Sequence, residues 1–262
     1  MEKLIKTNDY NNLPKVDFDR VVYDEPNMKV YIETKAKYEF VDLGLSVKWA
    51  TKNVGADKIT DSGLYFEWGN SQGYKVTELG EVLSELEGVY QIAKMEPEMK
   101  SFMPDFSDYK WSTCVDNGGV MPLDVSQECN SFTKYNDSDN LLTLQSEDDG
   151  ANKEYSKMRM PTKEECQELL DNTTIKFVEN YMESGMNGGI FTSTKNGKSI
   201  FVPAAGGVGV GMVSGLGLGG GFWSSSLYTE VAEGAWLLGF GPGGRGVSVD
   251  GRFLGLPLRG VC

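Results

Sequence analysis

The first part of the chain alternates hydrophobic and polar residues, a pattern typical of strands that are exposed on one side. The run MKVYIETKAKYEF (28–40) is strand-like. Farther on, Leu43, Leu45, Val47 and Trp49 alternate with polar or small residues, which predicts a half-buried strand. Residues 1–38 are otherwise polar, so we expect an N-terminal extension or hairpin that serves as an attachment segment, followed by a separate domain over 39–262.

Residues 72–104 show a different period. Their apolar residues recur three or four positions apart, at Leu79, Val82, Leu83, Leu86, Tyr90 and Ala93. This spacing predicts an amphipathic helix, weakened by Gly80 and Gly88. Because Pro97 and Pro104 close the region, we expect an inserted helical segment at about 72–104, packed on the main body.

The run RMPTKEECQELLDN (159–172) predicts a second helix. Thr162 and Glu165 have the spacing of a capping box, and Cys166, Leu169 and Leu170 then form one apolar face. The run GGIFTSTKNGKSIFVPAAGG (188–207) predicts a hairpin with its turn at Lys195–Lys198. Before both, SEDD (146–149) fits a solvated loop or a helix start. A calcium loop is the alternative, but the alternating acids of an EF-hand are missing.

Composition narrows the classes of function. The chain has 262 residues with 12 Phe, 12 Tyr and 5 Trp, which is enough for a real core. The net charge of -13 disfavours nucleic-acid partners. From residue 201 onward, however, three acids balance three arginines, so the last quarter is neutral. The absence of histidine removes Ser-His triads and most zinc and copper sites, and we expect neither a metal nor a cofactor.

The cysteines and the N-terminus bear on location. Cys114 and Cys129 fit either a disulfide across a loop or two free thiols, and Cys166 and Cys262 belong to no CxxC pair. No run approaches the length of a membrane span, and the N-terminus lacks the apolar core of a signal peptide. We therefore expect a soluble chain without membrane insertion.

Glycine is concentrated at the C-terminal end, where residues 205–262 hold 18 of the 32 glycines. The segment FGPGGRGVSVDGRFLG (240–255) is the densest part, although glycine weakens strand and helix interiors. One explanation is the close approach of a ligand or another backbone, or a bulge. Phosphate binding is not supported, because no βαβ unit surrounds the GxGxxG-like patterns.

Seven ordered blocks resemble a known family: VDLGLSVKWAT, YFEWGN, RMPTKEECQELLDN, SIFVPAAG, FWSSSLY, AWLLGF and GLPLRGVC. Together they are similar to the C-type-lectin-fold domains related to the formylglycine-generating enzyme, in particular the major paralogous domain group of gut bacteria and phages. The resemblance covers about residues 39–262 without the insertion. It implies an α+β, C-type lectin fold with short antiparallel strands, a few helices and much irregular loop.

Some members of this family are variable proteins of diversity-generating retroelements, in which adenine-directed mutagenesis scatters AAC-type codons. Such codons cannot become Lys, Glu, Gln, Met or Trp, and none of these residues occurs from Leu237 to Leu256. The resemblance implies a hypervariable region at about 206–256 on a fixed scaffold of Trp223, Trp236, Phe240 and Arg252, with Trp and Phe in the core. Arg252 would be held by carbonyls or a carboxylate. In the first glycine-rich run (206–222), Gly206 and Met212 would be fixed.

The ligand-binding positions implied by this resemblance are Leu237, Gly239, Gly241, Pro242, Gly244, Arg245, Gly246, Val247, Ser248, Val249, Asp250, Gly251, Phe253 and Leu254. Arg245, Phe253 and Leu254 would be the anchors of a shallow face. The function expected is non-catalytic recognition of a surface protein or glycan by an adhesin at the cell surface, in the extracellular space or on a phage tail, with a virion or appendage partner at 1–38. The alternatives are an ordinary lectin-like or phage structural domain and an enzyme of the formylglycine-generating type, which would need a cysteine pair where Cys262 stands alone.

Overall fold

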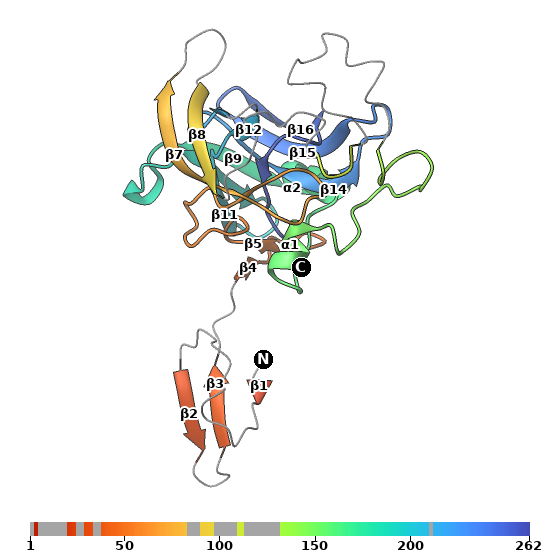
Figure 1. Ribbon diagram of the computed structural model, residues 1–262. Coiled ribbons are helices and arrows are strands. Elements are labelled where there is room, and N and C mark those ends of the chain that lie inside the picture. Colours follow the sequence, from red (N-terminus) through yellow and green to blue (C-terminus); the bar gives the residue numbers. More distant parts are fainter. Residues whose placement is uncertain are drawn as a thin grey trace. The chain divides into compact units, whose positions relative to one another are not determined.

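The computed structural model describes residues 3–4, 20–24, 29–33, 38–82, 90–96, 109–112, 132–209 and 212–262 (Figure 1). Contacts divide the chain into two units, Met1–Glu39 and Phe40–Cys262. The first unit has an antiparallel sheet of three strands in the order β1-β3-β2. These strands are β1 (Lys3–Leu4), β2 (Arg20–Asp24) and β3 (Lys29–Glu33).

The second unit consists mostly of short antiparallel strands with few helices, so the predicted α+β class is confirmed. Its elements are β4 (Phe40–Val41), β5 (Trp49–Ala50), β6 (Tyr65–Phe66), β7 (Lys75–Val82), β8 (Tyr90–Glu96), α1 (Gly150–Glu154), α2 (Lys163–Asp171), β9 (Thr173–Val178), the 3₁₀ helix η3 (Tyr181–Glu183), β10 (Gly188–Ser193), β11 (Ser199–Pro203), β12 (Gly207–Gly209), β13 (Met212–Ser214), β14 (Gly220–Leu227), β15 (Gly234–Gly241), β16 (Gly244–Gly251) and β17 (Leu256–Pro257).

Three sheets build most of this unit, in the orders β11-β10-β9, β12-β13-β8-β7 and β14-β15-β16. The hairpin predicted over 188–207 is confirmed, because β10 and β11 pair in antiparallel register with Gly188 opposite Pro203. Its turn includes Gly197, whose φ of +75° explains the glycine at that position. The unit also has two short pairs, β4 with β5 and β6 with β17, together with isolated bridges such as that between Val208 and Gly255.

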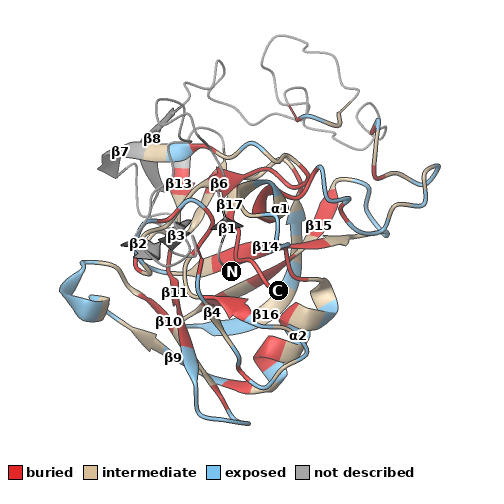
Figure 2. Ribbon diagram, turned by 90° about the horizontal axis from the view of Figure 1, so that it is seen from below, coloured by how far each residue is buried: buried red, intermediate tan, exposed pale blue. Residues whose placement is uncertain are grey.

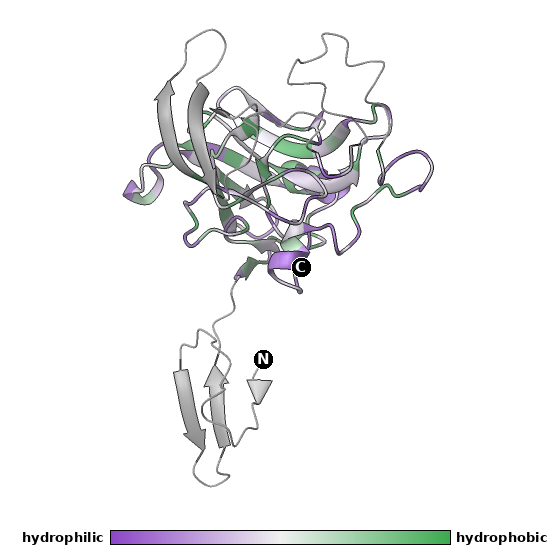
Figure 3. Cartoon of the chain, viewed as in Figure 1, coloured by the Kyte–Doolittle hydropathy of each residue, from purple (hydrophilic) through white to green (hydrophobic). Residues whose placement is uncertain are grey.

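The core lies where α2 packs on the sheet β14-β15-β16 (Figures 1 and 2). The predicted capping box is confirmed: Glu165 N donates to Thr162 Oγ1 at 3.2 Å, and Thr162 N donates to Glu165 Oε2 at 2.8 Å. The predicted apolar face of α2 is buried against a cluster that includes Trp49, Phe191, Phe222, Leu238 and Phe240. Figure 3 shows hydrophilic colouring on α1 and hydrophobic colouring along β15.

The strand predicted over 43–49 is wrong, because residues 42–48 form a bend between β4 and β5. The alternation of buried and exposed side chains is real, and Leu43 is fully buried. The segment is held by tertiary contacts instead of by a neighbouring strand. Ser193 Oγ donates to the Leu43 carbonyl at 2.6 Å, and Gly44 turns the chain at a φ of +73°. Alternation therefore indicated burial correctly but not pairing.

The helical insertion predicted at 72–104 is also wrong over its described part. Residues 75–82 and 90–96 form the antiparallel strands β7 and β8, residues 72–74 are not helical, and 83–89 and 97–104 lie outside the described residues. The register shifts between Val76 and Glu78 and again between Leu79 and Val82. A β-bulge adds a residue to a strand and so interrupts the two-residue alternation of its sequence. Hydrophobic residues of a bulged strand can therefore stand three positions apart in the sequence, as they do in a helix.

The SEDD segment starts helix α1 rather than a calcium loop. Asp149 caps the helix, since its side chain accepts from Ala151 N at 2.8 Å and from Asn152 N at 3.1 Å. Asp148 is buried and accepts from Lys134 Nζ at 2.6 Å, among other donors. One of the two predicted interpretations, a helix start, is therefore confirmed.

Asp148 is expected to make stability depend on pH. Burial alone would raise its pKa, but hydrogen bonds from Lys134, Tyr135 and Lys110 outweigh burial and hold the pKa of Asp148 below its ordinary value. A lowered pKa means that its contribution is present above the unfolded-state pKa of about 3.9 and is lost as the pH falls through the folded-state pKa. We expect Asp148→Asn to lower the free energy of unfolding by about 1–2 kcal/mol near neutral pH, because both lysines remain partly exposed to screening solvent.

Urea denaturation of wild type and Asp148→Asn over a series of pH values measures this effect. The difference between the two proteins should shrink as the pH is lowered below about 4. A difference that stays constant with pH would show that Asp148 carries no proton-linked stability. Because Asp149 is unchanged in both proteins, its own titration cancels in the comparison.

Candidate binding groove in the C-terminal sheet

The predicted ligand-binding positions lie on the hairpin β15–β16 and on the turn that follows it. The hairpin has a two-residue loop, Pro242–Gly243, and Gly241 pairs with Gly244 at its tip. In the order β14-β15-β16, the strand β16 is an outer strand of the sheet as far as the described residues extend. Arg245 and Pro242 are exposed near the tip.

Side chains of β16 alternate between the two sides of the sheet, so the predicted positions do not form one continuous face. Val247 lies opposite Leu238 and is packed against the core cluster below α2. Val249 lies opposite Trp236 on the same side. The prediction that Val247 faces a ligand is therefore wrong, because its strand parity turns it toward the helix.

Apart from Arg245 and Gly251, which have the parity of Val247, the other predicted strand positions share the other side of the sheet. Directly paired residues project to the same side, and the pairs here are Leu237 with Ser248, Gly239 with Gly246, and Gly241 with Gly244. Asp250 has the same parity on β16 as Ser248, whereas Gly251 has the parity of Val249. Seven of the eleven predicted positions on β15 and β16 thus point away from α2, and they do so together.

A cavity of about 510 Å³ lies on this side, and we call it the glycine groove. It is lined by Gly206, Gly207, Val208, Gly209, Ser214, Gly215, Gly219, Gly220, Gly221, Leu237, Gly239, Phe240, Asp250, Leu254 and Leu256. The groove brings together the two glycine-rich stretches of the chain, 206–222 and 237–256. Four of the predicted positions line it directly: Leu237, Gly239, Asp250 and Leu254.

The far wall of the groove lies within the predicted variable region at about 206–256, but none of its residues is among the predicted ligand-binding positions. It comes from β12, β13 and the turn before β14, which are joined to the end of the chain by reciprocal hydrogen bonds between Val208 and Gly255 at 2.8 and 2.9 Å. The sequence signal was the similar glycine density of residues 206–222, but nothing in the sequence indicated that this segment faces residues 237–256 across a groove.

Glycines around the groove divide into two kinds. At Gly239 a Cβ atom would make only an ordinary contact of 3.6 Å, and at Gly246 it would meet nothing within 4 Å. At Gly221 it would lie 2.7 Å from a backbone carbonyl, and Gly206 has a φ of +62°. Packing and backbone geometry therefore require glycine at the second pair but not at the first.

The predicted scaffold is buried, with one exception. Trp223 and Phe240 are in the core, and Arg252 is 1% exposed with its Nη1 donating to the Tyr135 carbonyl at 3.1 Å, so the prediction of a carbonyl partner is confirmed. The guanidinium carbon of Arg252 lies 3.8 Å from the ring centroid of Phe132, which offsets part of the cost of burial. Burial lowers the pKa of Arg252.

Trp236 is not a core residue, contrary to the prediction. It is only partly buried, its ring stands edge-on to Tyr228 at a centroid distance of 5.1 Å, and Lys163 Nζ lies 3.7 Å from its ring centroid. Because Lys163 is the first residue of α2, Trp236 covers the margin of the helix rather than its centre.

The groove is chemically neutral apart from Asp250. Its walls expose backbone groups and leucine side chains, so it suits binding by shape and hydrogen bonding more than proton transfer. Cys166 is buried, which raises the pKa of its thiol, and Cys262 is exposed; both are free. Cys114, Cys129 and the fixed position Met212 have side chains outside the described residues.

The residues that the structure describes contain no cluster of three or more Cys, Asp or Glu side chains arranged for a metal ion. Within the same part of the chain, every helix is too short or too polar to cross a membrane. Comparison of the chain with protein-family models, curated proteins and solved structures finds no match.

Proposed function

We propose that this protein is a non-catalytic binding protein that recognises a surface partner through the glycine groove and the adjoining side of β16. In this proposal the unit Phe40–Cys262 has a C-type lectin fold, and the chain is a variable protein of a diversity-generating retroelement. Glycine at the positions that have room for a side chain is then one outcome of the mutagenesis among many. The partner is a protein or glycan at a cell surface, and the N-terminal unit attaches the protein to a virion or appendage.

One observation carries the proposal: the two glycine-rich stretches meet at one cavity instead of lying in separate loops. A binding surface that tolerates substitution needs positions without packing constraints, next to a framework that cannot change. Gly239 and Gly246 have that freedom, whereas Phe240 and Arg252, which alternate with such positions along the chain, are buried.

The residues proposed as anchors differ in accessibility. Arg245 is exposed near the hairpin tip but has the strand parity of Val247, so it projects to the side of the sheet opposite the groove. Leu254 reaches the groove, where its Cδ2 would lie 2.8 Å from a Cβ atom at Gly209. Phe253 is half-buried and lies against Gly251. A shallow face has few large side chains, and a few large side chains supply most of the binding energy in most interfaces. The small side-chain area at the groove therefore supports weak affinity of this protein for its partner.

Sequencing the DNA downstream of the Cys262 codon tests the proposal. We expect a near-copy of the last coding segment, with AAC or AAT codons at the proposed variable positions, beside a reverse transcriptase gene. The codons for Phe240, Arg252 and Gly255 serve as the internal control, because they should be identical in both copies. Absence of a template would reduce the groove to an ordinary glycine-rich site and would favour the alternative of a non-diversified lectin-like domain.

A further inference from the structure

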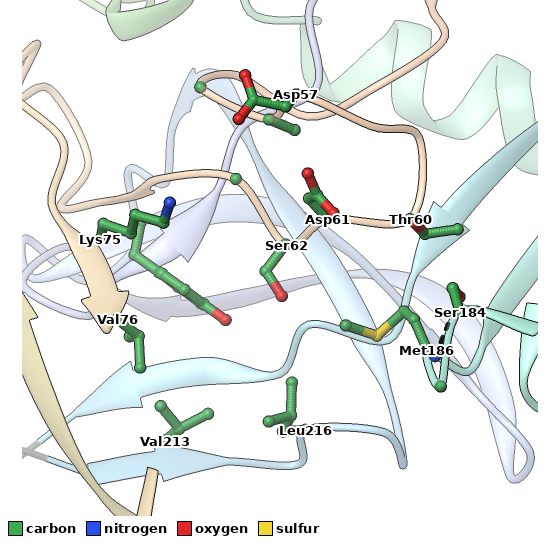
Figure 4. Close-up of a pocket in the computed structure, with 15 residues that line it drawn as sticks. Asp57, Thr60, Asp61, Ser62, Lys75, Val76, Ser184, Met186, Val213 and Leu216 are labelled. Atoms are coloured by element: carbon green, nitrogen blue, oxygen red, sulfur yellow. Dashed lines mark hydrogen bonds between the residues drawn. The ribbon is translucent and has the colours of Figure 1, made fainter. Parts of the chain in front are cut away.

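A second cavity of about 640 Å³ shares no lining residue with the glycine groove. Its walls are the loop 55–63, the start of β7, the turn 184–186, and residues Val213 and Leu216 (Figure 4). We call it the loop cavity. Its volume falls within the range of about 300–1,000 Å³ that is usual for small-molecule sites.

The lining of the loop cavity is polar on one side and apolar on the other. Figure 4 shows the side chains of Asp57, Asp61 and Ser62 along the loop, with Val213 and Leu216 across the cavity from them. The thioether of Met186 and the side chain of Val76 extend the apolar side. Lys75 stands at the opposite end from Met186.

The charges in this cavity are available to a ligand. Asp57, Asp61 and Lys75 form no ion pair with any residue that the structure describes. Asp61 Oδ2 accepts from Lys58 N at 2.9 Å, which fixes the carboxylate and leaves its other oxygen unused. The hydroxyl of Tyr65 is already committed, since it donates to the Ala205 carbonyl at 2.8 Å.

We propose that the loop cavity binds a zwitterion with an apolar body, an aliphatic amino acid or dipeptide. The ammonium group would pair with Asp57 and Asp61, and the carboxylate with Lys75. The side chains would cover Val76, Val213, Leu216 and Met186. Both ligand charges then pair with opposite charges of the protein, and the apolar body of the ligand is removed from water. A simple cation, a simple anion or a sugar would make only some of these contacts. The proposal is independent of the glycine groove.

Isothermal titration calorimetry of the full chain with L-leucyl-L-leucine tests the proposal, and L-leucine alone shows which size fits. Asp57→Asn combined with Asp61→Asn should weaken binding at least about tenfold, and so should Lys75→Gln. Acetylation of the dipeptide's amine should weaken its binding to wild type but should not weaken its binding to the aspartate variant any further. Amidation of the dipeptide's carboxylate should likewise weaken binding to wild type but not weaken binding to Lys75→Gln any further. Lys198→Gln, at the exposed hairpin turn, is the matched control and should bind normally.

Saturable binding with this pattern would establish the site. Two results would overturn the proposal: no heat of binding to the folded wild type at millimolar dipeptide, or binding that neither variant weakens. Circular dichroism of each variant ensures that lost binding is not lost folding. Asparagine at 61 still offers an oxygen to Lys58 N, so the loop should keep its conformation.

Discussion

Replacing Trp223 with alanine is expected to lower the free energy of unfolding by about 3–5 kcal/mol. The side chain is fully buried in β14, and its Nε1 donates to the carbonyl of Phe66 in β6 at 2.9 Å. The substitution therefore leaves both a cavity and a buried carbonyl without its donor. Urea denaturation followed by circular dichroism measures the loss.

Trp236→Ala is the matched control, because it makes the same change on the neighbouring strand. Trp236 is only partly buried, and its contacts with Tyr228 and Lys163 are worth about 1 kcal/mol together. We expect a loss of roughly that size. Equal losses for the two variants would contradict the different burial of the two tryptophans in the sheet β14-β15-β16.

Local chemistry was predictable from the sequence. The capping box of Thr162 and Glu165 and the turn at Lys195–Lys198 depend on residues within a few positions of one another, so their spacing alone determines their structure. For Arg252 the resemblance implied carbonyl or carboxylate partners, and the structure shows the Tyr135 carbonyl, an oxygen acceptor of the kind that a buried guanidinium needs.

Elements that depend on distant partners were not predictable. The strand β7 resembled a helix because two register shifts disturb its two-residue period. The loop before Trp49 resembled a strand because tertiary hydrogen bonds, such as that from Ser193 to Leu43, impose alternate burial on a bend. Hydrophobic spacing alone does not determine the backbone conformation, because several backbone paths place the same residues on one side.

The candidate site was predictable as a segment but not as a surface. The structure places residues 237–254 on one hairpin and its following turn, an arrangement that the sequence did not predict, and the strand parity of β16 sends Val247 to the core and Gly246 to the other side. The far wall at 206–209 could not be inferred, because it depends on the pairing of Val208 with Gly255. Long-range pairing of this kind leaves no periodic trace in the sequence.

Gly255→Val is expected to cost about 3 kcal/mol, whereas Gly246→Val should change the free energy of unfolding by less than about 0.5 kcal/mol. A Cβ atom at Gly255 would collide with the hydroxyl of the buried Tyr74 and would lie 3.2 Å from Val208 Cβ. At Gly246 the space is open, and a β-branched residue suits a strand. Both variants make the same change within one short segment, so their unfolded states are closely matched.

Chemical denaturation of the two variants separates the two explanations for the glycines. If Gly246→Val is as costly as Gly255→Val, the fold itself requires glycine along β16, and the proposal of a substitutable face loses its support. If only Gly255→Val is costly, glycine at 246 serves no purpose in folding. Its presence must then reflect the ligand or the mutational history of the segment. Gly239→Val extends the comparison into the groove, where the new side chain would occupy the space left for a partner and stability should again change little.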